Sequence, residues 1–447
     1  MPKPDHPRQA EFSFIRRARR REHAFKWTIG LVTLAVVCAL FASFEAGRHV
    51  LSGIPNFVET SFAQGRDFIV RRLIGLQPSR EEIDALLKLR REKTEADTRR
   101  SIERFYKSTS DEMRHLFDVS GMSPQDCIVG IGRANNGFLL SSLVFEHDDQ
   151  GRSYRLKPNV ASVWLRQITL DKGPFALFLV PDTPTVRQAA AAVGGIVDET
   201  SRQTTNAWGL RGPEPNPSAT VRGIVLGDSF MQGMFNDDQH TPPLALERFL
   251  ADAWNTDVSV LNTGHIGYAP EQYCQTLRAL GPKFKPHFVI ISVCPNDFGN
   301  DNDVVAGQGD DWDEATHWIG EILHWCRATN IPCMLVPAPL DRYVVGLRKD
   351  AWYPGRISNL FQGTSYAYCN PFEYFMEAHL RAQRDNFAPG RCVLFNHHIN
   401  DNHFSPRGAE LWAEVVGTRL LGLMPKPTSP PSSAVPTPAA ANALGKE

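Results

Sequence analysis

The sequence predicts an α/β protein in which helices bury both faces of a parallel sheet. Between residues 218 and 424, apolar runs of strand length alternate with patterns of helical period. Near-continuous apolar strands, rather than alternating ones, are typical of parallel sheets covered by helices on both sides. The expected strands are RGIVLGD, VSVLNTG, HFVIISV, PCMLVPAP and RCVLFNHH, and the expected helices span 239–254, 269–280, 312–329, 372–385 and 406–421.

The composition is that of a chain that folds around a packed core. Of 447 residues, 42% are hydrophobic and 22% are charged, which excludes a fibrous or mostly disordered protein. The net charge of −1 argues against a nucleic-acid partner, because such binders carry a basic stripe that neutralises phosphates.

The N-terminus predicts a membrane anchor. Residues 27–44 are eighteen residues without a charge, and a helix of that length spans about 27 Å, close to the hydrocarbon core of a bilayer. The basic segment 1–26, with five arginines between Arg16 and Arg21, precedes it. By the positive-inside rule, we expect a single-pass inner-membrane protein with the remaining chain on the periplasmic side. A cleaved signal peptide is the open alternative, because the small residue Ala42 could precede a cut.

Three further regions surround the predicted α/β domain, which we place at residues 200–424. Residues 45–122 are expected to form a helical juxtamembrane stalk, because from residue 78 onward charges recur at helical spacing. Residues 123–199 contain short apolar or alternating runs between turn residues, which predicts a small β-rich accessory region of hairpins. Residues 425–447 are rich in Pro, Ala and Ser and are expected to be a disordered tail.

A glycine-rich stretch in the accessory region, GIGRANNG at 130–137, superficially resembles a dinucleotide-binding loop. It lacks the third glycine at the proper offset, and no helical pattern follows it. An Asn-Asn-Gly turn explains the stretch, and we expect no cofactor.

Small polar clusters follow four of the predicted strands. Ser229 ends a Gly-Asp-Ser block between a strand and a helix, where its hydroxyl is raised at the sheet edge. Gly267 follows the second strand and can offer a backbone N–H to a ligand. Asn296 follows the third strand, and its amide can donate to an oxyanion. Asp401 and His403 follow the last run and supply a carboxylate and an imidazole base. Each cluster alone is a weak indication of a catalytic site. Their order along the chain, with serine first, then asparagine, then Asp-x-His, makes the combined indication strong.

These blocks resemble those of the SGNH (GDSL-type) hydrolase family, in particular its membrane-anchored bacterial members. The segment NAWGLRGPE at 206–214 also looks like their lead-in. The resemblance covers residues 200–424 and implies a three-layer α/β/α, flavodoxin-like parallel sheet. Two departures stand out: Cys294 occupies a common glycine position, and Asn400 occupies the usual position of the acid. Asp401, in a D-x-H arrangement similar to that of exopolysaccharide O-acetylation proteins, then remains as the acid.

The resemblance implies a serine esterase without a cofactor. His403 would remove the proton of Ser229, and Asp401 would orient the imidazole. The N–H groups of Ser229 and Gly267 and the amide of Asn296 would form the oxyanion hole. The expected substrate is an O-acyl ester, O-acetyl first, on an envelope or extracellular glycan, or another small ester. Two alternatives stay open: an O-acyltransferase that moves acetyl groups onto an exported polysaccharide with the same triad, and a non-catalytic carbohydrate-binding protein.

Histidines near these blocks permit other interpretations. His397 and His398, with Asp401 and His403, could hold a metal, but adjacent strand residues point to opposite faces, so we expect none. No C-x-x-C pair occurs among the eight cysteines, which leaves a zinc ribbon unsupported. His265, beside the glycine of the second block, is expected to be a solvated turn residue.

Overall fold

The computed structural model describes residues 80–131, 137–148, 152–168, 176–298, 310–346, 353–359, 366–384, 392–396 and 403–425. It divides into two compact units, Met1–Leu89 and Arg90–Glu447. The predicted basic segment, anchor and disordered tail lie outside the described residues. No helix within the described ranges is long and apolar enough to cross a membrane.

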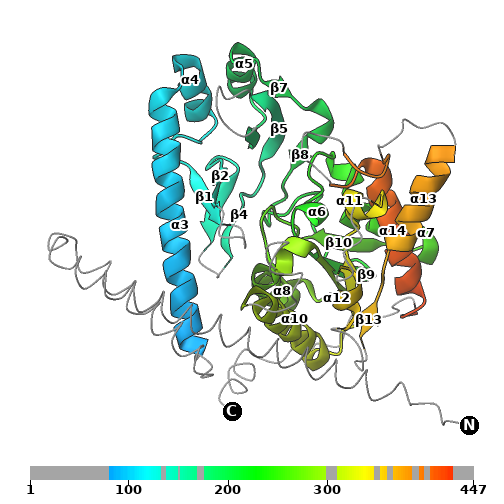
Figure 1. Cartoon of the computed structure of the whole chain (residues 1–447). Helices are drawn as coiled ribbons and strands as arrows, with labels where there is room; N and C mark the ends of the chain where they lie inside the picture. Colours follow the sequence, from blue (N-terminus) through cyan, green and yellow to red (C-terminus); the bar gives the residue numbers. More distant parts are fainter. Residues whose placement is uncertain are drawn as a thin grey trace, which may run out of the picture. The chain divides into compact units, whose positions relative to one another are not determined.

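A five-stranded parallel sheet forms the centre of the second unit (Figure 1). Its strands are β9 (Val221–Leu226), β10 (Val258–Asn262), β11 (Phe288–Val293), β12 (Cys333–Pro337) and β13 (Ala367–Tyr368), in the spatial order β10-β9-β11-β12-β13. Every residue of β9 to β12 is buried, as the apolar runs predicted. In β9, Ile224 pairs with Leu261 on one side and Val289 on the other. The order is that of flavodoxin-like sheets, whose ligand crevice opens where the strand order reverses, here between β9 and β11.

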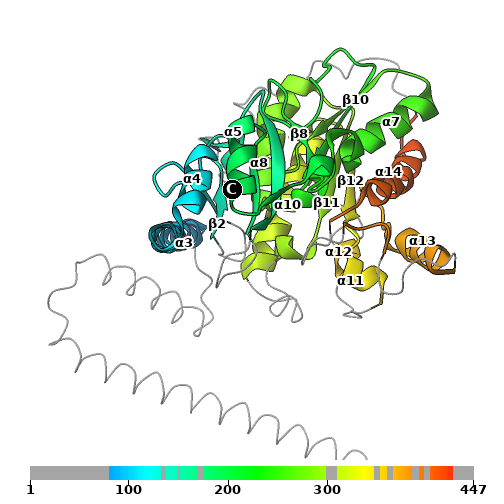
Figure 2. The same cartoon turned by 90° about the horizontal axis from the view of Figure 1, so that it is seen from above.

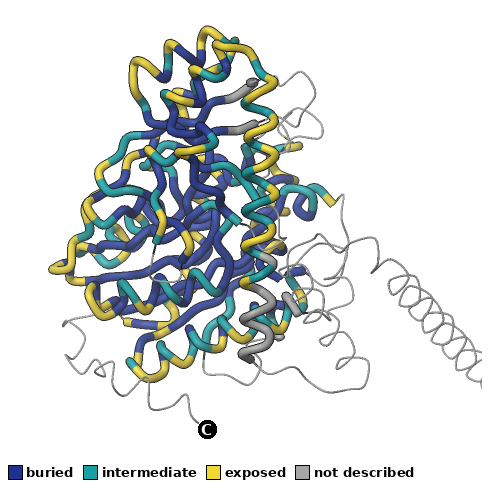
Figure 3. The backbone as a smooth tube through the Cα atoms, turned by 90° about the vertical axis from the view of Figure 1, so that its left-hand side faces the viewer, coloured by how far each residue is buried: buried dark blue, intermediate teal, exposed yellow. Residues whose placement is uncertain are grey.

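Helices cover both faces of this sheet (Figure 2). One layer contains α7 (Pro242–Trp254) and α14 (Pro406–Leu421), where Gly417 leaves room for the ring of Phe249. The other contains α8 (Pro270–Phe284) and α10 (Asp310–Ala328), where Gly281 leaves room for Trp325. These helices and α13 (Phe372–Arg384) match the five predicted ranges closely. Figure 3 shows the resulting pattern, with buried strands inside and exposed helix faces outside.

The prediction of a strand at RCVLFNHH is wrong. The described part of this run forms a turn, and Phe395 makes only an isolated bridge to Phe404. Its backbone bonds to the segment before α14 rather than to a neighbouring strand, because Ser405 N donates to Leu394 O at 3.0 Å. The run is apolar because its side chains are buried, and the fifth strand is the two-residue β13.

Antiparallel hairpins precede the sheet, as the alternating runs predicted. The pairs are β1 (Ile128–Ile131) with β2 (Gly137–Leu140), β3 (Phe145–Asp148) with β4 (Ser153–Leu156), and β5 (Ala161–Ile168) with β6 (Ala176–Pro181), while β7 (Ile196–Val197) and β8 (Gln203–Thr204) also pair with β5. The sequence did not predict helix α5 (Pro184–Ala192), which Thr183 caps. The shorter helices are η1 (Glu199–Ser201), α6 (Ser229–Gln232), η2 (Asp238–His240), η3 (Pro295–Phe298), α11 (Asp341–Val344) and α12 (Gly355–Asn359).

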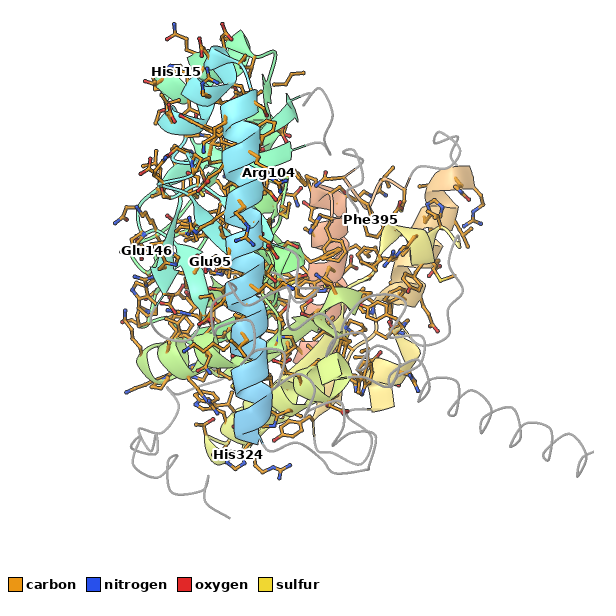
Figure 4. All side chains as sticks on the ribbon, turned by 60° about the vertical axis from the view of Figure 1, so that its left-hand side comes forward. Glu95, Arg104, His115, Glu146, His324 and Phe395 are labelled. Carbon is orange, nitrogen blue, oxygen red and sulfur yellow. The ribbon has the colours of Figure 1, made fainter. Side chains whose placement is uncertain are left out.

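The predicted stalk contains two helices, α3 (Arg80–Ser108) and α4 (Asp111–Val119). The part of α3 in the second unit makes contacts that the prediction of a stalk did not include. There Arg91 pairs with Glu271 of α8, Thr98 abuts Gly137 of β2, and Arg99 donates to Cys127 O at 3.4 Å. Charged side chains such as Glu95 and Arg104 occupy other positions along the same helix (Figure 4). The charge pattern marked a helix but did not reveal which of its residues make contacts.

Candidate active site

The turn after β9 places a serine at the start of a short helix. Ser229 is the first residue of α6 and is 8% exposed. Asp228 caps this helix, because its Oδ1 accepts a hydrogen bond from Phe230 N at 2.9 Å. The helix ends after one turn at Gly233, whose φ of 76° suits a residue without a side chain. This tight strand-to-helix turn presents the hydroxyl at the carboxyl edge of β9.

The structure brings His403 to this hydroxyl. His403 Nε2 lies 2.7 Å from Ser229 Oγ, although the two residues are 174 positions apart. The imidazole packs against the ring of Phe230, with centroids 4.5 Å apart, and His403 O accepts a hydrogen bond from Asn396 N. A histidine whose Nε2 accepts the hydroxyl proton carries its own proton on Nδ1. Asp401, the predicted acid, lies outside the described residues, as does Asn400.

The loop after β10 lies against the start of α6. A Cβ at Gly264 would lie 2.1 Å from Gln232 N, so only glycine permits this approach. The next contact is a 2.6 Å hydrogen bond from Ile266 N to Gln232 Oε1. Gly267 has a φ of 73°. Its N–H and that of Ser229 donate to no other residue in the described ranges, so both amides are free to bind an anion.

The turn after β11 supplies the third predicted residue. Asn296 lies in η3 and is exposed, whereas its neighbour Asp297 is fully buried. Asp297 accepts hydrogen bonds from Cys294 N at 2.8 Å and from the hydroxyl of Tyr273 at 3.0 Å. Asp297 therefore braces the turn that carries Asn296.

Cys294 joins this turn to the one that carries Ser229. Its Sγ lies 2.8 Å from Asp228 Oδ2 and also contacts Asn296 Oδ1. Burial raises the pKa of the Cys294 thiol well above its ordinary value, so the thiol stays protonated and acts as a donor. Burial also raises the pKa of Asp228, an effect that the hydrogen bond from Cys294 opposes. The sequence showed Cys294 only as a departure from the family pattern and did not reveal this partner.

Arg211 is a second residue whose role sequence reasoning missed. Its buried guanidinium donates to Gln232 O at 2.7 Å and Gly233 O at 2.6 Å, and pairs with Asp238 at 3.0 Å. These bonds satisfy carbonyls at the end of α6 and so hold the turn that carries Ser229. The only sequence signal was the position of Arg211 in the lead-in segment.

The expectation that His265 is solvated is wrong. It is 3% exposed and stacks on Tyr268, with ring centroids 4.5 Å apart. Its Nδ1 lies 3.1 Å from Thr263 O. Burial lowers the pKa of His265 to about 4, so the imidazole is neutral at pH 7. Packing by the accessory hairpins, which a turn sequence does not reveal, excludes water here.

The histidine and cysteine side chains do not form a metal site within the residues that the structure covers. Those residues contain no group of three or more His, Cys, Asp or Glu side chains that could hold a metal ion. His397 and His398 lie outside them. The seven cysteines that follow the predicted anchor are all buried.

No family model matches this chain, and no curated protein matches it. Among solved structures, the lipase/acylhydrolase from Enterococcus faecalis is 16% identical and matches 47% of this chain and 99% of its own, with a TM-score of 0.35. An acetyl xylan esterase, AlAXEase, is 17% identical over 45% of this chain and 100% of its own, with a TM-score of 0.36. A GDSL-like lipase from Bacteroides thetaiotaomicron is 13% identical over 46% and 90%, with a TM-score of 0.29. These TM-scores are too low to classify the site. We therefore classify it from its own geometry, which is a serine–histidine pair at the switch point of a doubly wound α/β sheet.

Proposed function

We propose that this chain is a serine ester hydrolase of the SGNH type that removes O-acyl groups, O-acetyl first, from an envelope or extracellular glycan. The observation that carries the proposal is the 2.7 Å contact between His403 Nε2 and Ser229 Oγ. A serine hydroxyl is a weak nucleophile until a neighbouring base accepts its proton, and this contact supplies the base. Its place beside β9 and β11, where flavodoxin-like sheets bind ligands, supports the same conclusion.

The reaction follows from the positions of these groups. Ser229 Oγ attacks the acyl carbon while His403 takes its proton, and the ester C–O bond breaks as the imidazolium protonates the leaving alcohol. Water then attacks the acyl-serine ester while His403 takes a proton from it, and the bond from the acyl carbon to Ser229 Oγ breaks as the imidazolium returns that proton to Oγ and the acid leaves. The free N–H groups of Ser229 and Gly267, together with the amide of Asn296, stabilise the oxyanion in both steps. Asp401 is the proposed partner of the imidazole, because the D-x-H spacing places it two residues before His403.

The experiment compares two serine variants of the full chain. Wild-type protein should hydrolyse an aryl acetate and react with a fluorophosphonate, and Ser229→Ala should lose both properties. Ser292→Ala removes a buried serine from the neighbouring strand β11 and should keep both. Labelling that persists in Ser229→Ala would refute the proposal. Acetate release from an O-acetylated polysaccharide, compared with a triacylglycerol, tests the substrate class, and acetyl transfer to an added unacetylated glycan would indicate an acyltransferase instead.

The location is a separate proposal, supported by the sequence alone. We propose that residues 27–44 hold the chain in the inner membrane, with the site on the periplasmic side. Protease added to spheroplasts should then digest the part of the chain after residue 45. Recovery of a soluble mature protein that begins near Ser43 would overturn this location and leave the chemistry untouched.

A further inference from the structure

We infer that Tyr154, on a hairpin outside the α/β sheet, is a positioning residue that fixes the oxyanion-hole peptide between Ile266 and Gly267. This inference rests on the proposed function and deepens it, because it makes the accessory hairpins part of the site. Tyr154 lies outside all of the sequence blocks that resemble those of SGNH hydrolases.

The contact is direct and buried. Tyr154, in β4, is 2% exposed, and its hydroxyl donates to Ile266 O at 2.6 Å. The ring of Phe138, from β2, lies on the same side of Gly267 as the Tyr154 hydroxyl, because a Cβ there would lie 2.4 Å from the Phe138 ring and 2.8 Å from that hydroxyl. Two hairpins therefore pack against the residue that offers the Gly267 N–H.

The geometry of the peptide bond makes this contact relevant to chemistry. Ile266 C=O and Gly267 N–H belong to one planar trans peptide, in which the oxygen and the hydrogen point in opposite directions. A donor that holds the oxygen therefore also fixes the direction of the N–H on the opposite side. Gly267, with a φ of 73°, lacks the steric restraint that a side chain would give, so an external restraint has most effect here. A hydrogen bond to the carbonyl also polarises the peptide and strengthens its N–H as a donor.

Tyr154 is itself held in place. Its backbone O accepts a hydrogen bond from the Tyr268 hydroxyl at 2.5 Å, and the rings of Phe138 and Phe145 pack edge-on against its ring. At the turn before β4, the buried Arg152 pairs with Asp148 at 2.7 Å, which ties β4 to β3. Because the Tyr154 hydroxyl is already fixed, it can restrain the neighbouring peptide with little loss of entropy. An oxyanion hole is preorganised when its donors are held in this way before the reaction begins.

The test is Tyr154→Phe in the full chain, with Tyr366→Phe as the matched control. Each variant removes one hydroxyl that donates to a backbone carbonyl at 2.6 Å, but Tyr154 bonds the Ile266–Gly267 peptide, whereas Tyr366, beside β13, bonds Leu323 O of α10. We expect Tyr154→Phe to lower kcat for an aryl acetate by about 2- to 10-fold, the usual effect of one hydrogen bond, with KM unchanged. The rate of inactivation by a fluorophosphonate should fall in parallel. In Tyr366→Phe both rates should stay within about two-fold of wild type.

A conservative replacement separates positioning from folding. 4-Aminophenylalanine at position 154 keeps the ring and a donor and should restore kcat, whereas 4-methylphenylalanine fills the same space without a donor and should not. This pair decides the question if Tyr154→Phe does not fold. Equal kcat in the two replacements, or equal losses of kcat in Tyr154→Phe and Tyr366→Phe, would overturn the inference. A wild-type protein that neither hydrolyses esters nor reacts with the fluorophosphonate would instead overturn the proposed function.

Discussion

Acidification should destabilise this protein through His265. Burial, with a smaller contribution from the neighbouring Arg152, lowers the pKa of this imidazole from 6.5 to about 4, although the hydrogen bond to Thr263 and the charge of Asp148 oppose the effect. In the unfolded chain His265 binds a proton below pH 6.5, whereas in the folded chain it stays neutral until about pH 4. Between these values the unfolded state binds more protons, so the free energy of unfolding falls as the pH falls.

The magnitude follows from the difference between the two pKa values. Each tenfold change in proton affinity corresponds to about 1.4 kcal/mol, so the change from 6.5 to about 4 corresponds to about 3 kcal/mol. This contribution is complete above pH 6.5 and is lost progressively as the pH falls toward 4. Such an amount is a large fraction of the stability of a typical domain, about 5–15 kcal/mol.

Urea denaturation across this pH range, in wild type and in His265→Gln, measures the effect. Glutamine does not titrate, and its amide can still donate to Thr263 O, the carbonyl beside His265 Nδ1. The variant should therefore be less sensitive to acid, by about 3 kcal/mol between pH 7 and pH 4. Comparing the two proteins cancels the opposite contribution of Asp228, whose pKa burial raises. Identical pH dependence in both proteins would refute the reasoning, because His265 would then titrate alike in the folded and unfolded states.

Three further predictions concern single substitutions at Asp401, Gly408 and Arg211. Asp401→Asn should lower kcat by about 10²–10⁴ with the fold intact, as for other triad acids, and steady-state kinetics with circular dichroism checks both. Gly408→Ala should lower the melting temperature through a loss of about 1–3 kcal/mol, because its Cβ would lie 2.0 Å from Leu394 O; an unchanged melting temperature would show that α14 can shift freely. Arg211→Met should cost about 3–5 kcal/mol in urea denaturation, since it leaves the buried carbonyls of Gln232 and Gly233 without this donor and Asp238 without its cation, and a loss below 1 kcal/mol would contradict the bracing role of Arg211.

The elements that the sequence predicted well are those with a strong local signal. Strands β9 to β12 are buried throughout and mostly apolar because helices cover both of their faces, and this pattern is visible without any tertiary knowledge. The run around Leu394 shows where the same signal fails. Its residues are equally apolar, yet burial in a turn and burial in a strand give the same pattern of letters.

The residues of the candidate site likewise include some with a local sequence signal and some without one. Ser229 and His403 stood out because each follows an apolar run with a distinctive neighbour, and the structure brings them together. Tyr154 did not, because its partner Ile266 lies 112 residues away and nothing near position 154 marks the contact. His265 was misjudged for the related reason that the hairpins covering it come from a distant part of the chain. Long-range contacts of this kind have no local signature, so only the folded chain reveals them.

The separation of 174 residues between Ser229 and His403 sets the order in which the site can form during synthesis. At about 5–20 residues per second, a ribosome takes about 10–35 s to reach the histidine after it has added the serine. The histidine precedes α14, and α14 packs against α7, the helix that connects β9 to β10. A nascent chain, or one cut before His403, therefore contains a serine turn without a base, and we expect reactivity toward esters to begin only when the C-terminal segment that carries His403 docks.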